Sequence, residues 1–184
     1  GHTAMAPDAD GTARRVMPFI EAQGRVVPWL GTGAALMYAG LAPEAVRRQD
    51  DRLLVGEAAL ALEPGGSQVL RMHGPWVSAS GRHTYDIVSF YDVLRAEEAY
   101  HAGEAPAIDP SIFRDKLVFV GLSALSENDV HTSPFGGPVM PGVQWHAAAA
   151  DDLLSGQSMR RASPATDMAV TAGASVGAGV LATM

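Results

Sequence analysis

Polar side chains that could contact a ligand gather in one connection, residues 122–140. They are Ser123, Asp129, His131, Thr132 and Ser133. A carboxylate, an imidazole and several hydroxyls close together form a typical polar binding surface, and connections of this length without regular structure are often functional. The alternative is that Asp129 and Thr132 brace the loop by accepting hydrogen bonds from its own backbone. We expect ligand-binding residues here, and the bracing role stays open beside it.

Two cationic side chains are candidates to face this loop. Arg71 and His73 lie on a predicted strand just before the turn Gly74-Pro75. Pro134 and Pro138 restrict the loop backbone. We therefore expect the loop to present its polar groups in a fixed arrangement, with Arg71 and His73 as the oppositely charged partners.

Ser123 also allows a hydrolase interpretation. Gly121-Leu122-Ser123-Ala124-Leu125 follows an apolar run and resembles the turn that exposes a nucleophilic serine. Leu125 replaces the second glycine of that motif, and the following residues do not continue as an amphipathic helix. The alternative hypothesis is a serine hydrolase that uses Ser123 with His131 or His146, against the simpler role of Ser123 as a hydroxyl that ends a strand.

His146 lies three residues after Val143 and is expected to point along the buried face of the last predicted soluble helix. A single histidine on such a face is typically a hydrogen-bonded core residue. Together with Asp129 and His131 it could ligate a metal, but no H-x-x-x-H spacing preorganises these groups. We therefore expect no metal and no cofactor.

Composition limits the class of protein. The chain has 184 residues, 47% of them hydrophobic and 18% charged, which is typical of a globular domain. Its net charge of −7 and the absence of a basic stripe argue against a nucleic-acid partner. The chain contains no cysteine, which excludes disulfides, thiol nucleophiles and iron–sulfur clusters.

The segments that position these residues alternate between strand and helix patterns, which predicts an α/β fold: a layered sheet with a buried central strand and flanking helices. Residues 117–121 form a continuous apolar run, the pattern of a strand covered on both faces. Further predicted strands lie at residues 3–5, 14–19, 53–55, 60–62 and 69–72, and helices at residues 29–41 and 89–103. The last predicted soluble helix begins at Pro141, ends at Gly156 and buries Val143, Ala147, Ala150 and Leu154.

The carboxyl-terminal segment differs from the rest. Residues 168–184 contain no charge, but this length falls short of the roughly 20 apolar residues that cross a bilayer. We expect the start of a truncated transmembrane helix, with residues 1–162 as the sensory part and residues 163–184 as this segment. A soluble helix rich in alanine and glycine is the alternative.

Four blocks in this order resemble one known family, the second type of CHASE domain, a cyclase- and histidine-kinase-associated sensory extracellular domain. The blocks are Phe113-Arg114-Asp115-Lys116-Leu117-Val118-Phe119-Val120-Gly121-Leu122-Ser123-Ala124, Asp129-Val130-His131-Thr132-Ser133-Pro134-Phe135-Gly136, Met140-Pro141-Gly142-Val143-Gln144-Trp145-His146-Ala147 and Asp152-Leu153-Leu154-Ser155-Gly156. The resemblance implies an extracytoplasmic sensor of a membrane-bound bacterial receptor, with a cytoplasmic output such as an adenylate cyclase or histidine kinase. It implies no enzymatic activity for this segment.

The resemblance covers mainly the second half of the family domain, so the sensor is expected to be incomplete. An apolar face or edge beside residues 117–121 should then be exposed. The expected partners are an unidentified small ligand or protein, the membrane through the carboxyl-terminal segment, and a second copy of the chain in a homodimer. The leading hypothesis is a signal-receiving domain in which the 122–140 loop binds a ligand and shifts the final soluble helix.

Overall fold

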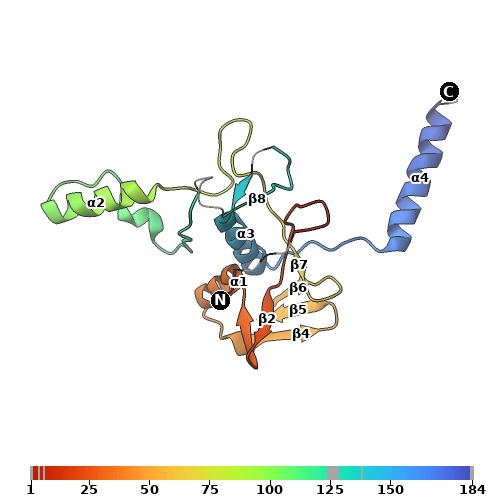
Figure 1. Cartoon of the computed structure of the whole chain (residues 1–184), viewed down its shortest axis with the longest axis horizontal. Helices are drawn as coiled ribbons and strands as arrows, with labels where there is room; N and C mark the ends of the chain where they lie inside the picture. The colour runs from red at the N-terminus through yellow and green to blue at the C-terminus, as the bar shows by residue number, and fades with distance from the viewer. Residues whose placement is uncertain (1, 4, 6, 124–128, 138, 183–184) are drawn as a thin grey trace.

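Two helices cross at the centre of the molecule. The computed structural model of the chain describes residues 2, 3, 5, 7–123, 129–137 and 139–182. Helix α1 (Leu30–Tyr38) packs against α3 (Gly142–Ser155), and their approach depends on Gly31. A Cβ atom at Gly31 would overlap the backbone carbonyl oxygen of His146. Figure 1 shows this pair surrounded by the strands.

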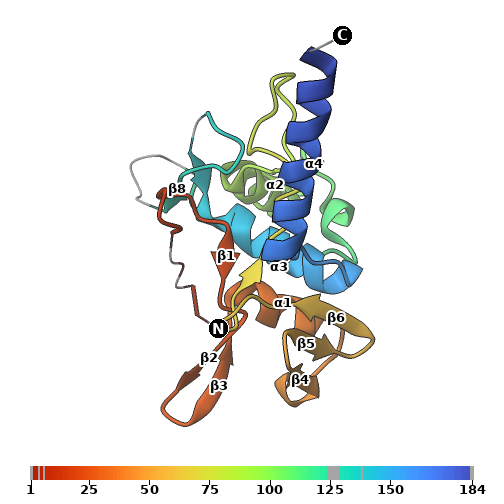
Figure 2. The same cartoon turned by 90° about the vertical axis from the view of Figure 1, so that its right-hand side faces the viewer.

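Small antiparallel sheets cover the helix pair. Among the described residues, β1 (Arg15–Val16) pairs with β7 (Gln68–Val69), β2 (Phe19–Ala22) with β3 (Arg25–Pro28), and β8 (Val130–His131) with β9 (Met140–Pro141). The strands β4 (Val46–Gln49), β5 (Arg52–Val55) and β6 (Ala58–Ala61) form a meander. Figures 1 and 2 place the β2–β3 hairpin and the meander at the same end of the body.

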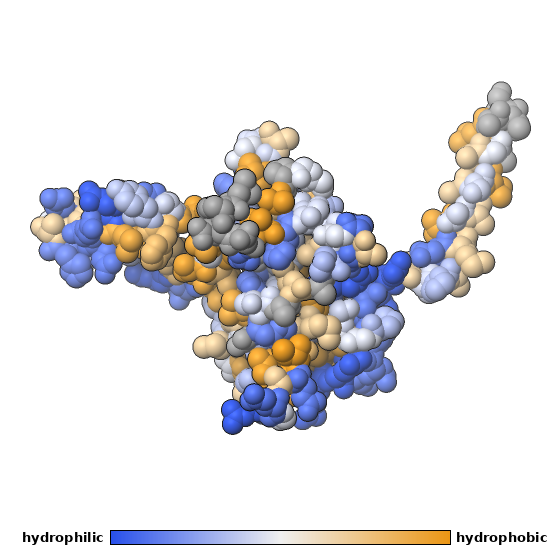
Figure 3. Space-filling model, in the orientation of Figure 1, coloured by the Kyte–Doolittle hydropathy of each residue, from blue (hydrophilic) through white to orange (hydrophobic). Residues whose placement is uncertain are grey.

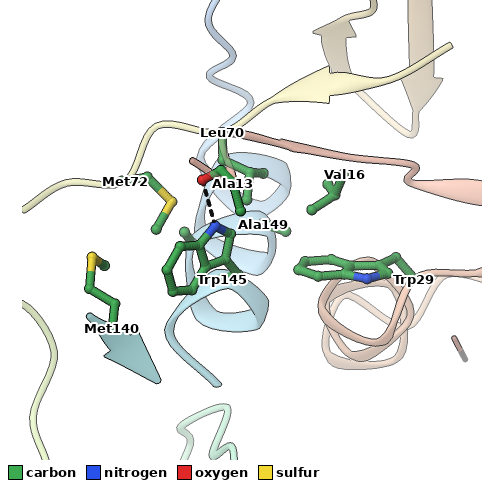
Figure 4. Close-up of a cluster of buried hydrophobic side chains, with 9 residues drawn as sticks. Ala13, Val16, Trp29, Leu70, Met72, Met140, Trp145 and Ala149 are labelled. Atoms are coloured by element: carbon green, nitrogen blue, oxygen red, sulfur yellow. Dashed lines mark hydrogen bonds between the residues drawn. The ribbon is translucent and has the colours of Figure 1, made fainter. Parts of the chain in front are cut away.

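The core consists of two apolar clusters on either side of α3. One surrounds Trp29 and Trp145, both fully buried, and the Trp145 indole donates a hydrogen bond to the Ala13 carbonyl at 3.0 Å (Figure 4). The other joins Leu36 of α1 with Leu60 of the meander and Leu153 of α3. Helix α3 therefore contacts both clusters, and a movement of α3 would change the packing of both.

Two helices stand apart from this body, on opposite sides of it in Figure 1. Helix α2 (Phe90–Ala102) begins after Ser89 and ends at Gly103, whose φ of 76° is in the left-handed region. It is followed by the short 3-10 helix η2 (Pro110–Phe113), while η1 (Pro43–Ala45) precedes β4. Helix α4 (Pro164–Ala182) has only exposed side chains wherever they are described, and Figure 3 shows little hydrophilic surface along most of its length.

The α/β class is confirmed, but the predicted central strand is wrong. Residues 117–121 belong to no strand: Leu117 and Phe119 pack on the core, whereas Val118 and Val120 are 49% and 77% exposed. The continuous apolar run therefore has one covered side. Val118 and Val120 are exposed apolar side chains, but they lie on no strand and form no sheet edge.

The predicted buried face of α3 is also wrong by about one position. Ala150 is buried as expected, but Leu154 is 42% exposed, and Val143 and Ala147 are only partly buried. The buried face carries Gln144, Trp145, Ala148, Ala149, Asp152 and Leu153. Two of these six side chains are polar, and a purely apolar periodicity cannot identify a face that includes them.

Candidate functional site

Asp152 is the buried centre of a polar cluster on α3. Its side chain is fully buried. One carboxylate oxygen, Oδ2, accepts hydrogen bonds from the Gln68 amide at 3.2 Å and from the Arg71 backbone N–H at 3.0 Å. The other oxygen, Oδ1, has no hydrogen-bond partner among the described residues. A buried carboxylate with one unsatisfied oxygen is costly, which favours its protonated form.

His73 faces that unsatisfied oxygen. Its Nε2 atom lies 3.7 Å from Asp152 Oδ1 and 3.1 Å from Asp151 Oδ2. The His73 backbone adopts a φ of 53°, a left-handed conformation that is uncommon for a residue other than glycine. The imidazole lies beside the carboxyl-terminal half of α3, between the carboxylates of Asp151 and Asp152.

Burial controls the protonation of this cluster. Desolvation raises the pKa of Asp152 to about 7, and the Arg71 backbone N–H only partly offsets it. Burial and the two neighbouring carboxylates likewise raise the pKa of Tyr85, whose hydroxyl is buried and has no partner among the described residues. The Tyr85 ring meets His73 edge-on, with 6.5 Å between the ring centroids. We name Gln68, Arg71, His73, Tyr85, Asp151 and Asp152 the Asp152 cluster.

The Asp152 cluster is connected to the segment that leaves α3. The Arg71 guanidinium donates a hydrogen bond to Gln157, which follows the α3 cap Gly156. Ser158 accepts a hydrogen bond from the backbone N–H of Ala61 at 2.7 Å, and Met159 forms a β-bridge with Val69. The exit segment, residues 157–161, is thus held on the body just before α4 begins at Pro164.

The predicted loop residues lie at the opposite end of α3. Asp129 accepts a hydrogen bond from the Gly142 backbone N–H through its own carbonyl at 2.8 Å, and its carboxylate occupies the space that a Cβ atom at Gly142 would need. His131 lies 3.8 Å from that carboxylate, and its ring meets Trp145 edge-on. Asp129 therefore contacts the beginning of α3 through its backbone carbonyl and its carboxylate, and its bond to Gly142 comes from the helix rather than from the backbone of the loop.

Thr132 and Ser133 differ in burial. Thr132 is exposed and bridges to Thr12, whereas Ser133 is buried and its hydroxyl accepts a hydrogen bond from the Phe135 backbone N–H at 3.2 Å. The Ser133 hydroxyl is used within the loop, in the manner of a Ser/Thr turn.

His146 is a core residue rather than a solvent-facing base. Its ring lies 4.2 Å from the Trp29 ring and stacks at 6.4 Å on Phe119, measured between ring centroids. Burial lowers its pKa to about 4, so the imidazole is neutral near pH 7. The expected hydrogen bond of a core histidine is not fully realised, because Nδ1 is buried without a partner among the described residues.

The geometry does not assemble a catalytic serine. Ser123 is exposed, and the structure gives no hydrogen bond between Ser123 and His131 or His146. Residues 124 and 125 of the proposed serine turn lie outside the described residues. Within the described part of the chain, no three His, Asp or Glu side chains are placed to hold a metal ion.

The predicted residues therefore separate into two groups along α3. The expectation that Arg71 and His73 face the loop is wrong, because the left-handed backbone at His73 and the buried carboxylate of Asp152 direct them to the carboxyl-terminal half of the helix. Sequence reasoning also missed Gln68, Tyr85, Asp151 and Asp152 as site residues. The detectable signal was the Asp151-Asp152 pair at the end of an alanine-rich helix.

Comparison with known proteins identifies one relationship. The family model of the CHASE2 domain matches residues 1–182. No curated protein and no solved structure matches the chain.

Proposed function

Because the chain belongs to the CHASE2 family, the sensory extracellular domains of cyclase and kinase receptors, we propose that it receives the signal for a membrane-bound bacterial receptor. In this proposal the domain lies on the extracytoplasmic side. It couples the binding of a ligand or partner to a cytoplasmic output such as an adenylate cyclase or a histidine kinase. The observation that carries the coupling is the position of α3, which contacts the candidate loop at one end and leads to α4 at the other.

Helix α4 supports a membrane connection. It contains no charge after Asp167, and Met168, Val170, Val176 and Leu181 are each at least 66% exposed. A helix of this composition that packs against no other element leaves its apolar side chains in water. An apolar environment would stabilise it. In the described part of the chain no helix reaches the length and apolarity of a membrane span, and we propose that α4 begins one.

The proposed signal route follows the contacts of α3. A ligand at Asp129 or His131 would shift the beginning of α3. The hydrogen bonds of the Asp152 cluster would then displace residues 68–73 and the exit segment together with the helix. Packed helices shift as units, so a small displacement at one end reaches the other. The ligand can bias α4 only by its difference in affinity between the two positions of α3.

Output from the full-length receptor tests this function. We expect Asp129→Ala to change cyclase or kinase activity in membranes while the domain stays folded, because the Asp129 carboxylate is about half exposed and contributes little to stability. Asp86→Ala is the matched control, since that carboxylate is 99% exposed. Unchanged output with Asp129→Ala would contradict the route, and unfolding would assign Asp129 the bracing role alone.

A further inference from the structure

A second site lies where the exit segment meets the amino-terminal strand. A groove of about 550 Å³ opens there, and we name it the arginine groove. It is lined by Asp8, Ala9, Asp10, Arg14, Arg15, Val69, Met159, Arg160 and Arg161. Four of these nine side chains are guanidinium groups, in a chain whose net charge is −7.

Pairing of three extended segments builds the groove. Arg15 of β1 pairs with Val69 of β7, and Val69 also bridges Met159 of the exit segment. This arrangement brings Arg14 and Arg15 near Arg160 and Arg161, although about 145 positions separate the two arginine pairs in the sequence. Val69, Met159 and Ala9 give the groove an apolar part as well.

Internal carboxylates neutralise the arginines incompletely. Arg14 lies 3.0 Å from Asp8 and 2.9 Å from Asp10, and Arg15 also pairs with Asp8. Arg160 pairs with Asp51, outside the groove lining. The Arg161 guanidinium forms no ion pair among the described residues. A fourth carboxylate, Glu63, accepts a hydrogen bond from the Arg161 backbone N–H at 3.4 Å. The guanidinium donors of Arg161 are therefore the ones that the described chain leaves available to a ligand.

We propose that the arginine groove binds a phosphate group. Guanidinium groups present flat pairs of N–H donors that match phosphate oxygens, and a phosphate can accept from several of them at once. Arg160 and Arg161 would supply one side of the site and Arg14 the other. The apolar surface of Val69 and Met159 would hold the rest of the molecule that carries the phosphate.

The position of the groove gives this binding a consequence for signalling. Arg160 and Arg161 lie only a few residues before α4, so a phosphate bridging them to Arg14 would hold the exit segment on the body. This consequence rests on the proposed function, whereas the binding itself does not. The phosphate group can come from a soluble phosphate ester or from a lipid headgroup, since α4 is proposed to enter the membrane beside the groove.

Calorimetric titration of the complete chain with glycerol phosphate, at constant ionic strength, tests the soluble source. We expect saturable binding that Arg161→Gln weakens at least ~10-fold, as for loss of a charge-assisted hydrogen bond. Arg25→Gln, on the β2–β3 hairpin and outside the groove, is the matched control and should leave binding unchanged. Asp8→Asn should tighten binding, because it releases Arg14 and Arg15 from an internal competitor.

Flotation with vesicles tests the lipid source. Vesicles that contain phosphatidylglycerol are compared with vesicles of phosphatidylcholine alone. Insertion of α4 should contribute equally to binding of both kinds of vesicle. Stronger retention on phosphatidylglycerol that is lost with Arg161→Gln but not with Arg25→Gln supports a headgroup site. Binding in either arm with this variant pattern supports the proposal. Failure of both arms, or equal losses with Arg161→Gln and Arg25→Gln, would overturn it, whereas the proposed membrane position of α4 would not be affected.

Discussion

The buried carboxylate of Asp152 accepts a hydrogen bond from the backbone N–H of Arg71 at 3.0 Å, across 81 positions of the sequence. This bond fixes the carboxyl-terminal half of α3 to the segment that follows β7. Because the same carboxylate has an unpartnered oxygen 3.7 Å from His73, the link is sensitive to protonation as well as to packing.

Asp152 should make stability fall as the pH rises. Burial raises its pKa to about 7, above the ordinary value of 3.8, so the folded state holds a proton that the unfolded state releases within this range. Its contribution is fully present below the unfolded pKa and is lost as the pH rises through 7. Asp152→Asn removes this titration.

Urea unfolding of both proteins at several pH values measures the effect. As the pH rises from the unfolded pKa of Asp152 to its folded pKa, the unfolding free energy of the wild type should fall relative to that of Asp152→Asn. The expected fall is up to ~1.4 kcal/mol for each pH unit. A difference that does not vary with pH would show that Asp152 has the same pKa in the folded and unfolded states.

His146 should act in the opposite direction. Burial lowers its pKa from 6.5 to about 4, so its contribution is present above pH 6.5 and is lost as the pH falls toward 4. His146→Phe keeps an aromatic ring beside Trp29 and Phe119 but cannot titrate. We expect a smaller decrease of Tm on acidification than in the wild type. The control His101→Phe, at a side chain 73% exposed, should follow the wild type; an identical acid loss in His146→Phe would count against its burial as a neutral group.

The crossing of α1 and α3 should tolerate no side chain at Gly31. An added Cβ atom meets the His146 backbone, which cannot rotate away, so Gly31→Ala should reduce the unfolding free energy by about 1–3 kcal/mol. Gly173→Ala on α4 is the matched control, because nothing lies within 4 Å of its added Cβ. Denaturant unfolding distinguishes the two, and equal stability of both variants would mean that the helices do not approach at Gly31.

Much of the local structure could be predicted from the sequence. The helix ends at Gly103 and Gly156 were recognisable because glycine readily adopts the left-handed cap that both residues have. Helix α3 begins at Gly142, one residue after the predicted start at Pro141. The β2–β3 hairpin was missed. Its turn residue Gln23 has a φ of 53°, and glutamine gives no signal for a left-handed turn.

The candidate site was predicted less well, for a physical reason. Asp129 and His131 lie 3.8 Å apart, which follows from their closeness in the sequence, and their role in ligand binding stays a prediction. The partners of His73 depend on long-range packing against α3, which local patterns do not encode. The apolar run at residues 117–121 likewise could not show that only Leu117 and Phe119 would be covered.

The proposed membrane position of α4 is tested most directly by cysteine labelling of the full-length receptor in intact cells. These 184 residues contain no cysteine, so each single substitution reports one site once any cysteines elsewhere in the receptor have been replaced. Ser80→Cys lies at an exposed position of the body, and Val176→Cys lies on α4. We predict that a membrane-impermeant maleimide labels Ser80→Cys without lysis and labels Val176→Cys only after detergent is added. Labelling of Val176→Cys in intact cells, or of Ser80→Cys only after lysis, would contradict an extracytoplasmic sensor connected to the membrane through α4.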